Sequence, residues 1–441
     1  MKEYLLIETS PGLRGKVELE GAKNAVLVIM ASLILTAGKS RLTNVPASSD
    51  VYTMIALLQE LGAVVVFESK NKILEVDTSD LYNWRVSPDI IKKIRASILV
   101  MGPLLARFGK VEVAMPGGDA IGTRPIDLHL KAFAKMGAIV DQSGDGVAAY
   151  APVGLRSVRC VLDYPSVGAT ENILMAAVLA PGVTEIVNAA LEPEVLDLIT
   201  VLQKMGADVT CQIPATLRIC GVQELKPIEH SIMFDRLEAG TLLLAVAATG
   251  GQLSLPQAPV QAMDVFLEKM NDMGHSITID QHGSLHFKAT MEPRAISFKT
   301  MPYPGYPTDL QAPMLAALCL AHGTSMVHET VYESRMLHVQ ELQKMGAQID
   351  LRAETVRITG VARLSGTCVV GHDIRAAAAL IIAGLAAQGK TIITGVPHIR
   401  RGYHGLDKKL QQLGARIEFV QTEEDLFLQN SSRKISQLTS N

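Results

Sequence analysis

The chain has 441 residues, a formal net charge of −3 and an aromatic content of only 4%. This length is sufficient for two or three domains with sizeable cores. The nearly balanced charge and the shortage of aromatic side chains argue against a general nucleic-acid-binding surface. The apolar runs are too short to span a membrane, and the first residues, "MKEYLLIETSPG", lack the apolar core of a signal peptide.

Two helix-ending patterns alternate along the chain, and each occurs six times. In the first, an apolar helix is followed by a glycine and a strand, and the glycines are Gly38, Gly109, Gly182, Gly250, Gly323 and Gly389. In the second, an amphipathic helix such as "AFAKMG" has the same ending, and the glycines are Gly62, Gly137, Gly206, Gly274, Gly346 and Gly414. A glycine after the last turn is a typical helix C-cap. The spacing therefore predicts six units of about 70 residues, each with two helices and several strands.

The first helix of each unit is apolar on nearly all sides, as in "ASILVMGPLLARF" and "RAAAALIIAGLAA". A helix without a polar face has to be buried all round, whereas the amphipathic second helix is expected to face water. We therefore predict buried helices inside and sheets outside. Because a single core stops growing near about 250–300 residues, we expect an α/β protein with two domains of three units each. The boundary is expected near residue 230, where "LKPIEHS" offers a proline.

Charged residues lead into these buried helices in all six units. The stretches are "GAKN" (Lys23, Asn24), "IRAS" (Arg95), "SVGATEN" (Ser166, Glu171), "DRLEAG" (Asp235, Arg236), "YPTDL" (Asp309) and "DIRAA" (Arg375). A helix N-terminus attracts anions and disfavours cations unless an anion lies between. Either the cations pair with nearby Asp and Glu, or the helix ends of two facing lobes form a cleft for a polyanion.

Two loops add to this cationic set. The stretch "MPGGDAIGTRPIDLHL" (115–130) contains Arg124, Asp127 and His129, and "HIRRGYHG" (398–405) contains Arg400 and Arg401. Pro125 biases Arg124 towards an extended conformation. Each loop, taken by itself, is also compatible with a solvated turn.

Several motifs resemble, in order and spacing, the UDP-N-acetylglucosamine 1-carboxyvinyltransferases over roughly residues 10–420. They include "GAKNA", "RASI", "GPLLARFG", "RPIDLHL", "SVGAT", "EPE" and "HIRRGY". The resemblance implies a two-domain inside-out α/β barrel built from six βαβαββ-like repeats. It implies that residues 1–22 join residues 231–430 in one lobe and that residues 23–230 form the other lobe, with a mobile loop at 115–125. It also implies closure of the lobes on a sugar nucleotide. The polar composition of residues 431–441 predicts a flexible tail.

The implied reaction transfers the enolpyruvyl group of phosphoenolpyruvate to the 3-hydroxyl of UDP-N-acetylglucosamine and releases phosphate, as the first committed step of peptidoglycan biosynthesis. Two alternatives remain: a transferase that uses shikimate 3-phosphate as acceptor, and a non-catalytic UDP-sugar-binding homologue. We expect these small molecules as partners, no nucleic acid or membrane, and a monomer or weak homo-oligomer. The five scattered cysteines have no metal-ligand spacing and fit a reducing compartment, so we expect a cytoplasmic protein without metal or cofactor.

The resemblance also assigns residues. For phosphoenolpyruvate it implies contacts from Lys23, Asn24, Arg124, Arg335, Arg375 and Arg401, with Lys23, Arg124 and Arg401 on the phosphate and Arg335 and Arg375 on the carboxylate. For the sugar nucleotide it implies Arg95, Arg124, Pro125, Ile126, Asp127, Leu128, Tyr164, Ser166, Val167, Asp309 and Val331. Catalytic roles are implied for Lys23, Asp119, Asp309 and Arg401. His129 is expected at the pocket, and Glu192 and Glu194 are expected as supporting groups.

Asp119 departs from the family pattern, because most members have a cysteine after "PGG". That cysteine donates a proton and is alkylated by the epoxide fosfomycin. A carboxyl group has a reference pKa of about 3.9, against about 8.5 for a thiol, so Asp119 is a competent acid near neutral pH only if its pKa is raised. Burial or substrate anions would raise it and Arg124 would lower it, and the sequence leaves that balance open. We expect an active transferase in which Asp119 is the general acid, Asp309 accepts the hydroxyl proton, and fosfomycin has no effect.

Overall fold

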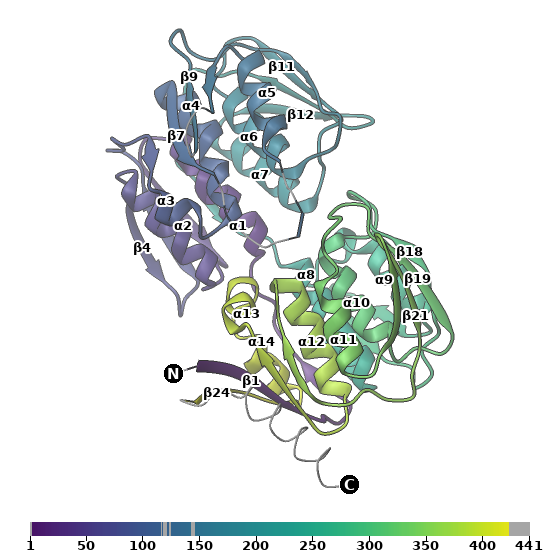
Figure 1. Ribbon diagram of the computed structural model, residues 1–441. Helices are drawn as coiled ribbons and strands as arrows, with labels where there is room; N and C mark the ends of the chain where they lie inside the picture. Colours follow the sequence, from purple (N-terminus) through teal and green to yellow (C-terminus); the bar gives the residue numbers. More distant parts are fainter. Residues whose placement is uncertain (1, 116, 118–120, 123–124, 143–145, 423–441) are drawn as a thin grey trace.

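The computed structural model describes residues 2–422 except 116, 118–120, 123–124 and 143–145. These residues form two lobes, each around its own hydrophobic core (Figure 1). The core of the first lobe runs from residue 22 to residue 232. The core of the second lobe combines residues 5–19 with residues 237–417. None of the helices in the described part of the chain has the length and apolar character needed to cross a membrane.

One helix of each unit lies inside its lobe. These inner helices are α1 (Lys23–Ser32), α4 (Met101–Phe108) and α6 (Val167–Ala177) in the first lobe, and α8 (Arg236–Thr249), α10 (Gln311–Leu318) and α12 (Ile374–Ala386) in the second. In the second lobe all three pack against one another. All residues of α10 and almost all of α12 are buried, as expected for helices that lack a polar face.

The second helix of each unit covers the inner helices and buries only one face. These outer helices are α2 (Ser49–Glu60), α5 (Asp127–Lys135), α7 (Pro193–Met205), α9 (Asp264–Asp272), α11 (Leu337–Lys344) and α14 (Leu406–Gln412). After each of them the chain passes through one of the six predicted glycines with a positive φ angle. Four further short helices are η1 (Leu33–Leu35), α3 (Pro88–Ile91), η3 (Val260–Ala262) and α13 (Val396–Gly402).

Two inner helices are interrupted where the sequence predicted continuous ones. A 3₁₀ turn, η2 (Arg95–Val100), precedes α4, and η4 (Thr308–Leu310) precedes α10. Pro103 and Pro313 lie at the third position of the following α-helix. Proline has no N–H and its ring collides with the carbonyl four residues earlier, so it is tolerated in the first turn of a helix but not further along. The α-helical pattern therefore starts close to each proline.

The described residues form six four-stranded sheets around the helices, and all six share one order of strand roles. The first strand, at the edge, pairs in parallel with the second. The second strand pairs antiparallel with the third, and the third pairs antiparallel with the fourth. In the first lobe the sheets are β14 (Glu229–Ser231), β3 (Lys39–Thr43), β5 (Ile73–Asp77), β4 (Val64–Glu68); β6 (Arg85–Val86), β7 (Lys110–Ala114), β9 (Gly146–Tyr150), β8 (Ile139–Asp141); and β10 (Arg159–Val161), β11 (Val183–Val187), β13 (Thr216–Cys220), β12 (Asp208–Gln212). In the second lobe they are β2 (Arg14–Lys16), β15 (Gln252–Leu255), β17 (Leu285–Lys288), β16 (Ser276–Ile279); β18 (Phe298–Lys299), β19 (Thr324–His328), β21 (Thr355–Thr359), β20 (Gln348–Arg352); and β22 (Cys368–Val370), β23 (Lys390–Thr394), β1 (Lys2–Glu8), β24 (Arg416–Thr422).

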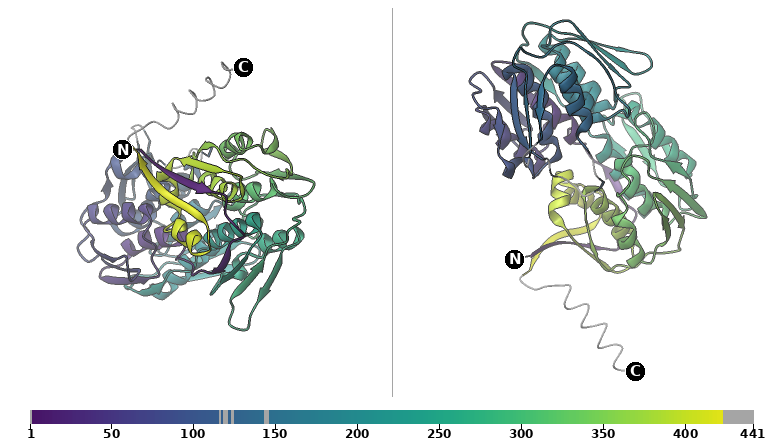
Figure 2. Two further views of the ribbon diagram at one scale, coloured as in Figure 1. Left: turned by 90° about the horizontal axis from the view of Figure 1, so that it is seen from below. Right: turned by 45° about the horizontal axis from the view of Figure 1, so that its top comes forward.

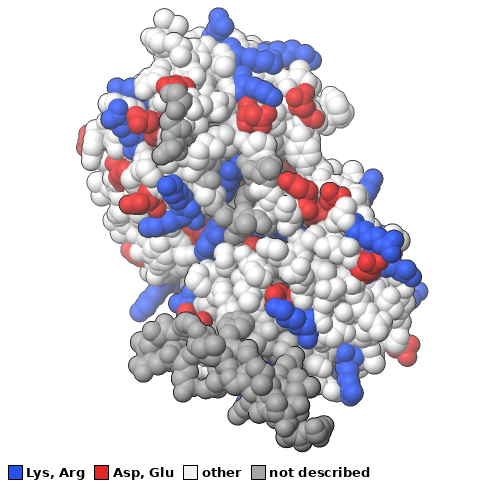
Figure 3. Space-filling view, viewed as in Figure 1, with Lys and Arg blue, Asp and Glu red and all other residues white. Residues whose placement is uncertain are grey.

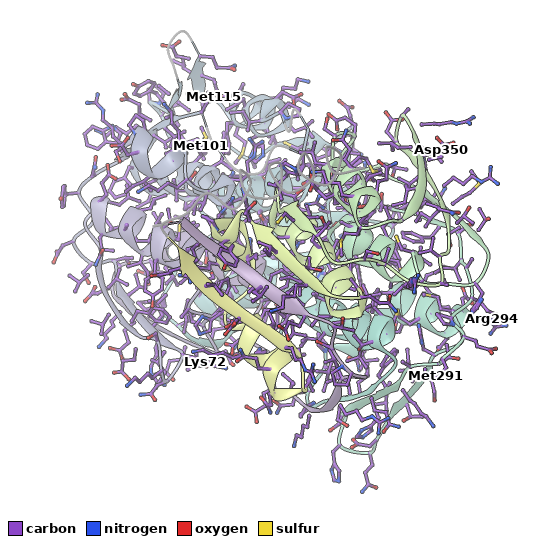
Figure 4. The ribbon with its side chains drawn as sticks, turned by 60° about the horizontal axis from the view of Figure 1, so that its bottom comes forward. Lys72, Met101, Met115, Met291, Arg294 and Asp350 are labelled. Carbon is purple, nitrogen blue, oxygen red and sulfur yellow. The ribbon has the colours of Figure 1, made fainter. Side chains whose placement is uncertain are left out.

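Three strands are supplied from elsewhere in the chain and complete the ring of units in each lobe. β14 follows the third unit but pairs with β3 of the first, and β2 pairs with β15 of the fourth. The N-terminal β1 lies between β23 and β24 of the sixth unit (Figure 4). The same backbone hydrogen bond recurs in all six units. In each, the N–H of the residue after the third strand of the sheet donates to the carbonyl of a glycine that follows the inner helix. The donor–acceptor pairs are Thr78–Gly38, Ala151–Gly109, Gly221–Gly182, Ala289–Gly251, Gly360–Gly323 and, from the N-terminal strand, Thr9–Gly389.

The two lobes are connected by two adjacent segments of the described chain, residues 19–22 and 232–236 (Figure 2). The segments are hydrogen-bonded to each other, from Ala22 N to Met233 O at 2.7 Å and from Asp235 N to Glu20 O at 2.9 Å. A side chain at Gly21 would bring its Cβ to 1.8 Å from the carbonyl oxygen of Asn44, so this position accepts only glycine. The connection therefore keeps the starts of α1 and α8 next to each other.

Candidate functional site

A cavity of about 670 Å³ lies between the lobes. The N-terminal ends of all six inner helices, including the 3₁₀ turns that begin two of them, contribute to its wall. Helix N-termini carry unpaired N–H groups and about half a positive charge each. On the face shown in Figure 3, both basic and acidic side chains lie at the junction of the two lobes. The helix ends therefore contribute partial positive charge to the cavity, whose described side chains include both cations and carboxylates.

Lys23 and Arg401 share one acidic partner in this cavity. The Nζ of Lys23, the first residue of α1, is 3.3 Å from Oδ2 of Asp50. The Nε of Arg401, on α13 of the second lobe, is 3.0 Å from Oδ1 of the same carboxylate. Asp50 lies on α2 of the first lobe, so the ion pair with Arg401 connects the lobes across the cavity.

Asp309 holds the other pair of cations. Its Oδ1 is 2.7 Å from Nη1 of Arg335, and its Oδ2 is 2.8 Å from Nη2 of Arg375. Burial would by itself raise the pKa of Asp309, but the charges of Arg375 and Arg335 outweigh burial and hold this pKa well below its ordinary range. Asp309 is therefore ionised at neutral pH in this state. Arg375 also donates to the hydroxyl of Tyr403, which fixes the plane of its guanidinium.

A third charged group combines Arg236 with carboxylates from the start of α7. Arg236 donates to Glu194 through two hydrogen bonds of 3.0 and 3.1 Å. Burial would lower the pKa of Arg236, but Glu194, Glu192 and Asp309 together raise it. Glu192 accepts a hydrogen bond from the backbone N–H of Tyr303, which again joins the two lobes.

Glu171 is also on this wall, but it has a different electrostatic environment. Burial raises its pKa well above the ordinary value, and the negative charges of Glu194 and Glu192 raise it further. In the part of the chain that the structure describes, Glu171 forms no ion pair with a Lys or Arg. Its carboxyl group therefore keeps its proton to higher pH than an ordinary glutamate does.

On the first-lobe side of the cavity, His129 is held in one protonation state by Asn172. The Oδ1 of Asn172 accepts a hydrogen bond from Gly102 N at 2.8 Å, so its amide nitrogen has to face Ile98 O and Nδ1 of His129, which is 2.9 Å away. An amide nitrogen only donates, so Nδ1 accepts and the proton is on Nε2. Burial, together with the charge of Arg95, lowers the pKa of His129 to about 4. His129 is thus a neutral donor at the cavity wall.

Most of the residues assigned by resemblance lie on the wall of this one cavity. They are Lys23, Asn24, Arg95, Pro125, Asp127, Leu128, His129, Tyr164, Ser166, Val167, Glu192, Glu194, Asp309, Val331, Arg335, Arg375 and Arg401. Ile126 is not among the lining residues; it is 5% exposed and packs in the core of the first lobe. Asp119, Arg124 and the tail 431–441 lie outside the described residues.

The cavity also contains residues to which the sequence gave no role. Glu171 and Arg236 stand out as charges before buried helices, but their partners could not be inferred from the sequence. Asp50 gave no signal, because an acid in the first turn after the capping Ser48 is an ordinary helix start. Tyr303 and Tyr332 line the cavity from loops that have no distinctive pattern. Among the described residues, no group of three or more His, Cys, Asp and Glu is arranged to hold a metal ion.

Comparison with known proteins gives the class first. The sequence matches the family described as EPSP synthase (3-phosphoshikimate 1-carboxyvinyltransferase) over residues 7–425. Among solved structures, the enolpyruvyl transferase NikO from Streptomyces tendae superimposes with a TM-score of 0.86 at 23% identity, covering 96% of this chain and 99% of that one. EPSP synthase from Acinetobacter baumannii has a TM-score of 0.75 at 17% identity, covering 96% of this chain and 100% of that one. These likenesses confirm the predicted fold class.

The particular branch of this family follows from closer relatives. UDP-N-acetylglucosamine 1-carboxyvinyltransferase 1 of Caldanaerobacter subterraneus subsp. tengcongensis is 45% identical over 95% of this chain and 99% of that protein. UDP-N-acetylglucosamine 1-carboxyvinyltransferase of Geobacter metallireducens is 43% identical over the same shares. The chain belongs to the UDP-N-acetylglucosamine 1-carboxyvinyltransferases within the EPSP synthase family, which confirms the resemblance.

The buried pair of Arg236 and Glu194 gives a stability prediction. Arg236→Met leaves the carboxylate of Glu194 buried without its two donors, so we expect the free energy of unfolding to fall by about 3–5 kcal/mol. The double variant Arg236→Met, Glu194→Leu removes both charges and is expected to regain most of that loss. Chemical denaturation followed by circular dichroism measures both. A single variant as stable as the unmodified protein would contradict the assigned pairing.

Glu171 gives a prediction of pH dependence. Its pKa is raised in the folded state from an ordinary value of 4.5, so the folded protein keeps a proton that the unfolded chain releases. The stability that Glu171 contributes is complete below pH 4.5 and is lost as the pH rises through its folded-state pKa. Glu171→Gln mimics the protonated acid, so we expect unfolding midpoints at pH 5 and pH 8 to differ less than in the unmodified protein. Glu224→Gln, at an exposed carboxylate, is the control. An equal change in the control would refute the interpretation.

Proposed function

We propose that the chain transfers the enolpyruvyl group of phosphoenolpyruvate to the 3-hydroxyl of UDP-N-acetylglucosamine and releases phosphate, as the first committed step of peptidoglycan biosynthesis. The observation that carries this proposal is the convergence of six helix N-termini, with Lys23, Arg335, Arg375 and Arg401, on one cavity. The names of the relatives supply the two substrates. Both substrates are small, soluble and anionic, and we propose that a monomer or weak homo-oligomer acts on them in the cytoplasm.

Phosphoenolpyruvate has two anionic groups, and the cavity holds two carboxylates that mark where these groups would bind. Without a substrate, Asp50 forms ion pairs with Lys23 and Arg401. Asp309 forms ion pairs with Arg335 and Arg375. A phosphate at the first pair, together with Arg124, and a carboxylate at the second pair would compete with these aspartates. Planar guanidinium groups suit both anions, because they donate two parallel hydrogen bonds.

The sugar nucleotide is assigned to the side of the cavity formed by the first lobe. The start of α6, at Val167, offers backbone N–H groups to the phosphates of the nucleotide, and Ser166 caps this helix. Arg95 and the stretch 125–128 contribute further contacts, with Ile126 supporting this stretch from the core. Tyr164 is 41% exposed, and burial of its hydroxyl, with Tyr332 and carboxylates nearby, raises its pKa to about 12, so it stays a neutral donor.

The chemistry requires one base and one acid. As the 3-hydroxyl oxygen bonds to C2 of phosphoenolpyruvate, its proton passes to Asp309 and the π electrons of C2=C3 take a proton at C3. The intermediate then loses phosphate from C2 and a proton from C3. The pKa of Asp309 is depressed by Arg335 and Arg375. A donor carboxylate that shares these arginines weakens their hold on Asp309, and its pKa rises towards that of a useful base.

The test is release of phosphate from phosphoenolpyruvate with and without UDP-N-acetylglucosamine. Release should require the sugar nucleotide and should not occur with shikimate 3-phosphate. Lys23→Met and Arg401→Met should each lower kcat/KM by roughly 100-fold or more, because each removes a charge from the developing phosphate. Arg294→Ala, on the outer side of the second lobe (Figure 4), should leave turnover unchanged. Binding of the sugar nucleotide without phosphate release would favour the non-catalytic homologue.

We further propose that Asp119 is the acid that protonates C3 and that its carboxylate makes the protein insensitive to fosfomycin. This assignment rests on the place of Asp119 after "PGG". A general acid has to be protonated, so activity falls as the pH rises above its pKa. A thiol keeps its proton to higher pH than a carboxyl group does.

Three variants therefore test Asp119. Asp119→Asn should abolish most turnover, since an amide does not donate a proton to carbon. Asp119→Cys should retain turnover, move the falling limb of the pH–rate profile to higher pH and become sensitive to fosfomycin. Asp89→Cys, at a surface position, should gain no sensitivity. Covalent inactivation of the unmodified protein by fosfomycin, or full turnover of Asp119→Asn, would disprove the assignment.

A further inference from the structure

Glu329 is a buried carboxylate behind the cavity wall. It directly follows β19, is 1% exposed and is not among the residues that line the cavity. Among the described residues, four donors converge on it. Its Oε1 accepts from Thr300 Oγ1 at 2.7 Å, Val331 N at 2.8 Å and Tyr332 N at 3.1 Å, and its Oε2 accepts from Thr308 Oγ1 at 2.9 Å. The described residues provide no ion-pair partner for this carboxylate, so hydrogen bonds compensate its burial.

On one side, Glu329 fixes the backbone of the loop at 330–332. The N–H groups of Val331 and Tyr332 both point at Oε1, and the neighbouring Thr330 N donates to Thr300 Oγ1 at 2.8 Å. Thr300 is thus bound to Glu329 and to the loop that follows it. Val331 and Tyr332 line the cavity from the second lobe, and Val331 is among the residues assigned to the acceptor substrate.

On the other side, Glu329 is connected to Arg335 through one hydroxyl. Arg335 Nη1 donates to Thr308 Oγ1 at 3.0 Å and to Asp309 Oδ1 at 2.7 Å. A guanidinium cannot accept, so the oxygen of Thr308 accepts from Arg335 while its proton goes to Glu329. The direction of the chain Arg335–Thr308–Glu329 is therefore determined, and each bond in such a chain strengthens the next.

We propose that Glu329 is a positioning residue for both substrates: it sets the loop backbone that meets the acceptor and, through Thr308, the guanidinium of Arg335 that meets the donor carboxylate. This inference rests on the proposed function. Glu329 is buried behind the wall and takes part in no bond that forms or breaks. Its contribution is to hold two otherwise separate parts of the wall in one geometry.

The amide of glutamine can separate the two connections. In Glu329→Gln the amide oxygen can still accept from the N–H groups of Val331 and Tyr332, but the amide nitrogen replaces Oε2. That nitrogen only donates, so Thr308 can no longer donate to residue 329, and its oxygen has to accept from both this nitrogen and Arg335. The directed chain from Arg335 to residue 329 is interrupted at Thr308. In Glu329→Ala both connections are lost.

The experiment measures steady-state kinetics with each substrate varied in turn, and binding of UDP-N-acetylglucosamine by calorimetry. Glu329→Gln should raise KM for phosphoenolpyruvate by roughly ten-fold, the usual effect of one charge-assisted hydrogen bond, with nucleotide affinity unchanged. Glu329→Ala should also weaken nucleotide binding by roughly ten-fold. Thr308→Val combined with Glu329→Gln should be no worse than either variant alone, because both interrupt the same chain. His328→Ala, at the adjacent exposed position, is the control.

The outcomes separate this inference from the proposed function. If the unmodified protein releases no phosphate, the proposed function fails, while calorimetry with Glu329→Ala still tests the connection to the loop. If both Glu329 variants lose thermal stability but keep both KM values and the nucleotide affinity, the role is purely structural and the inference is overturned. Additive losses in the double variant would also overturn it.

Discussion

The candidate site depends on the orientation of six apolar helices, whose N-termini meet at the cavity between the lobes. Each helix is buried because its sequence has no polar face, and its N-terminal end, which carries a partial positive charge, lies at the wall of the cavity. The positive potential that results is increased by Lys23, Arg335, Arg375 and Arg401. Without a substrate it is compensated by Asp50 and Asp309. The fold therefore brings the partial positive charges of six helix ends to the cavity, and the side chains add both cations and carboxylates.

The carboxylates of this cavity differ because their surroundings differ. Asp309 lies between two guanidinium groups, whose charges lower its pKa and keep it ionised. Glu171 is buried and has other carboxylates as neighbours, and both effects raise its pKa. Glu194 is fixed by the bidentate contact with Arg236. One cavity thus contains carboxylates whose pKa values are shifted in opposite directions by their surroundings.

Periodic features of the sequence predicted much of the fold. The glycine spacing indicated six units, and the apolar helices indicated an inside-out arrangement, because both depend on local patterns. The helix interruptions at Met101 and Gln311 follow from Pro103 and Pro313, and a continuous apolar pattern concealed them. The partner of β3 could not be predicted, because β14 follows it by almost two hundred residues and strand pairing over that distance leaves no local pattern.

For the site, charge at the helix starts was a useful signal, but the pairing of these charges was not predictable. Lys23 and Arg375 were compatible both with local ion pairs and with a polyanion cleft, and the structure places them in ion pairs on the wall of the cavity. The ion pairing of Asp50 could not be predicted, because its partner Arg401 is far away in the sequence. Ile126 was assigned with its neighbours, yet its side chain faces the core, since consecutive residues at a helix start point in different directions.

The connection between the lobes links binding to their relative position. The two crossing segments are bonded to each other beside Gly21, so few contacts there have to change if the lobes rotate. Two contacts that span the cavity involve side chains instead. Arg401 forms an ion pair with Asp50, and the N–H of Tyr303 donates to Glu192. Arg401 is also assigned to the donor phosphate, so a ligand that takes this arginine from Asp50 replaces a bond between lobes with a bond to itself. Any such ligand necessarily shifts the balance between lobe arrangements, by as much as its affinity for them differs.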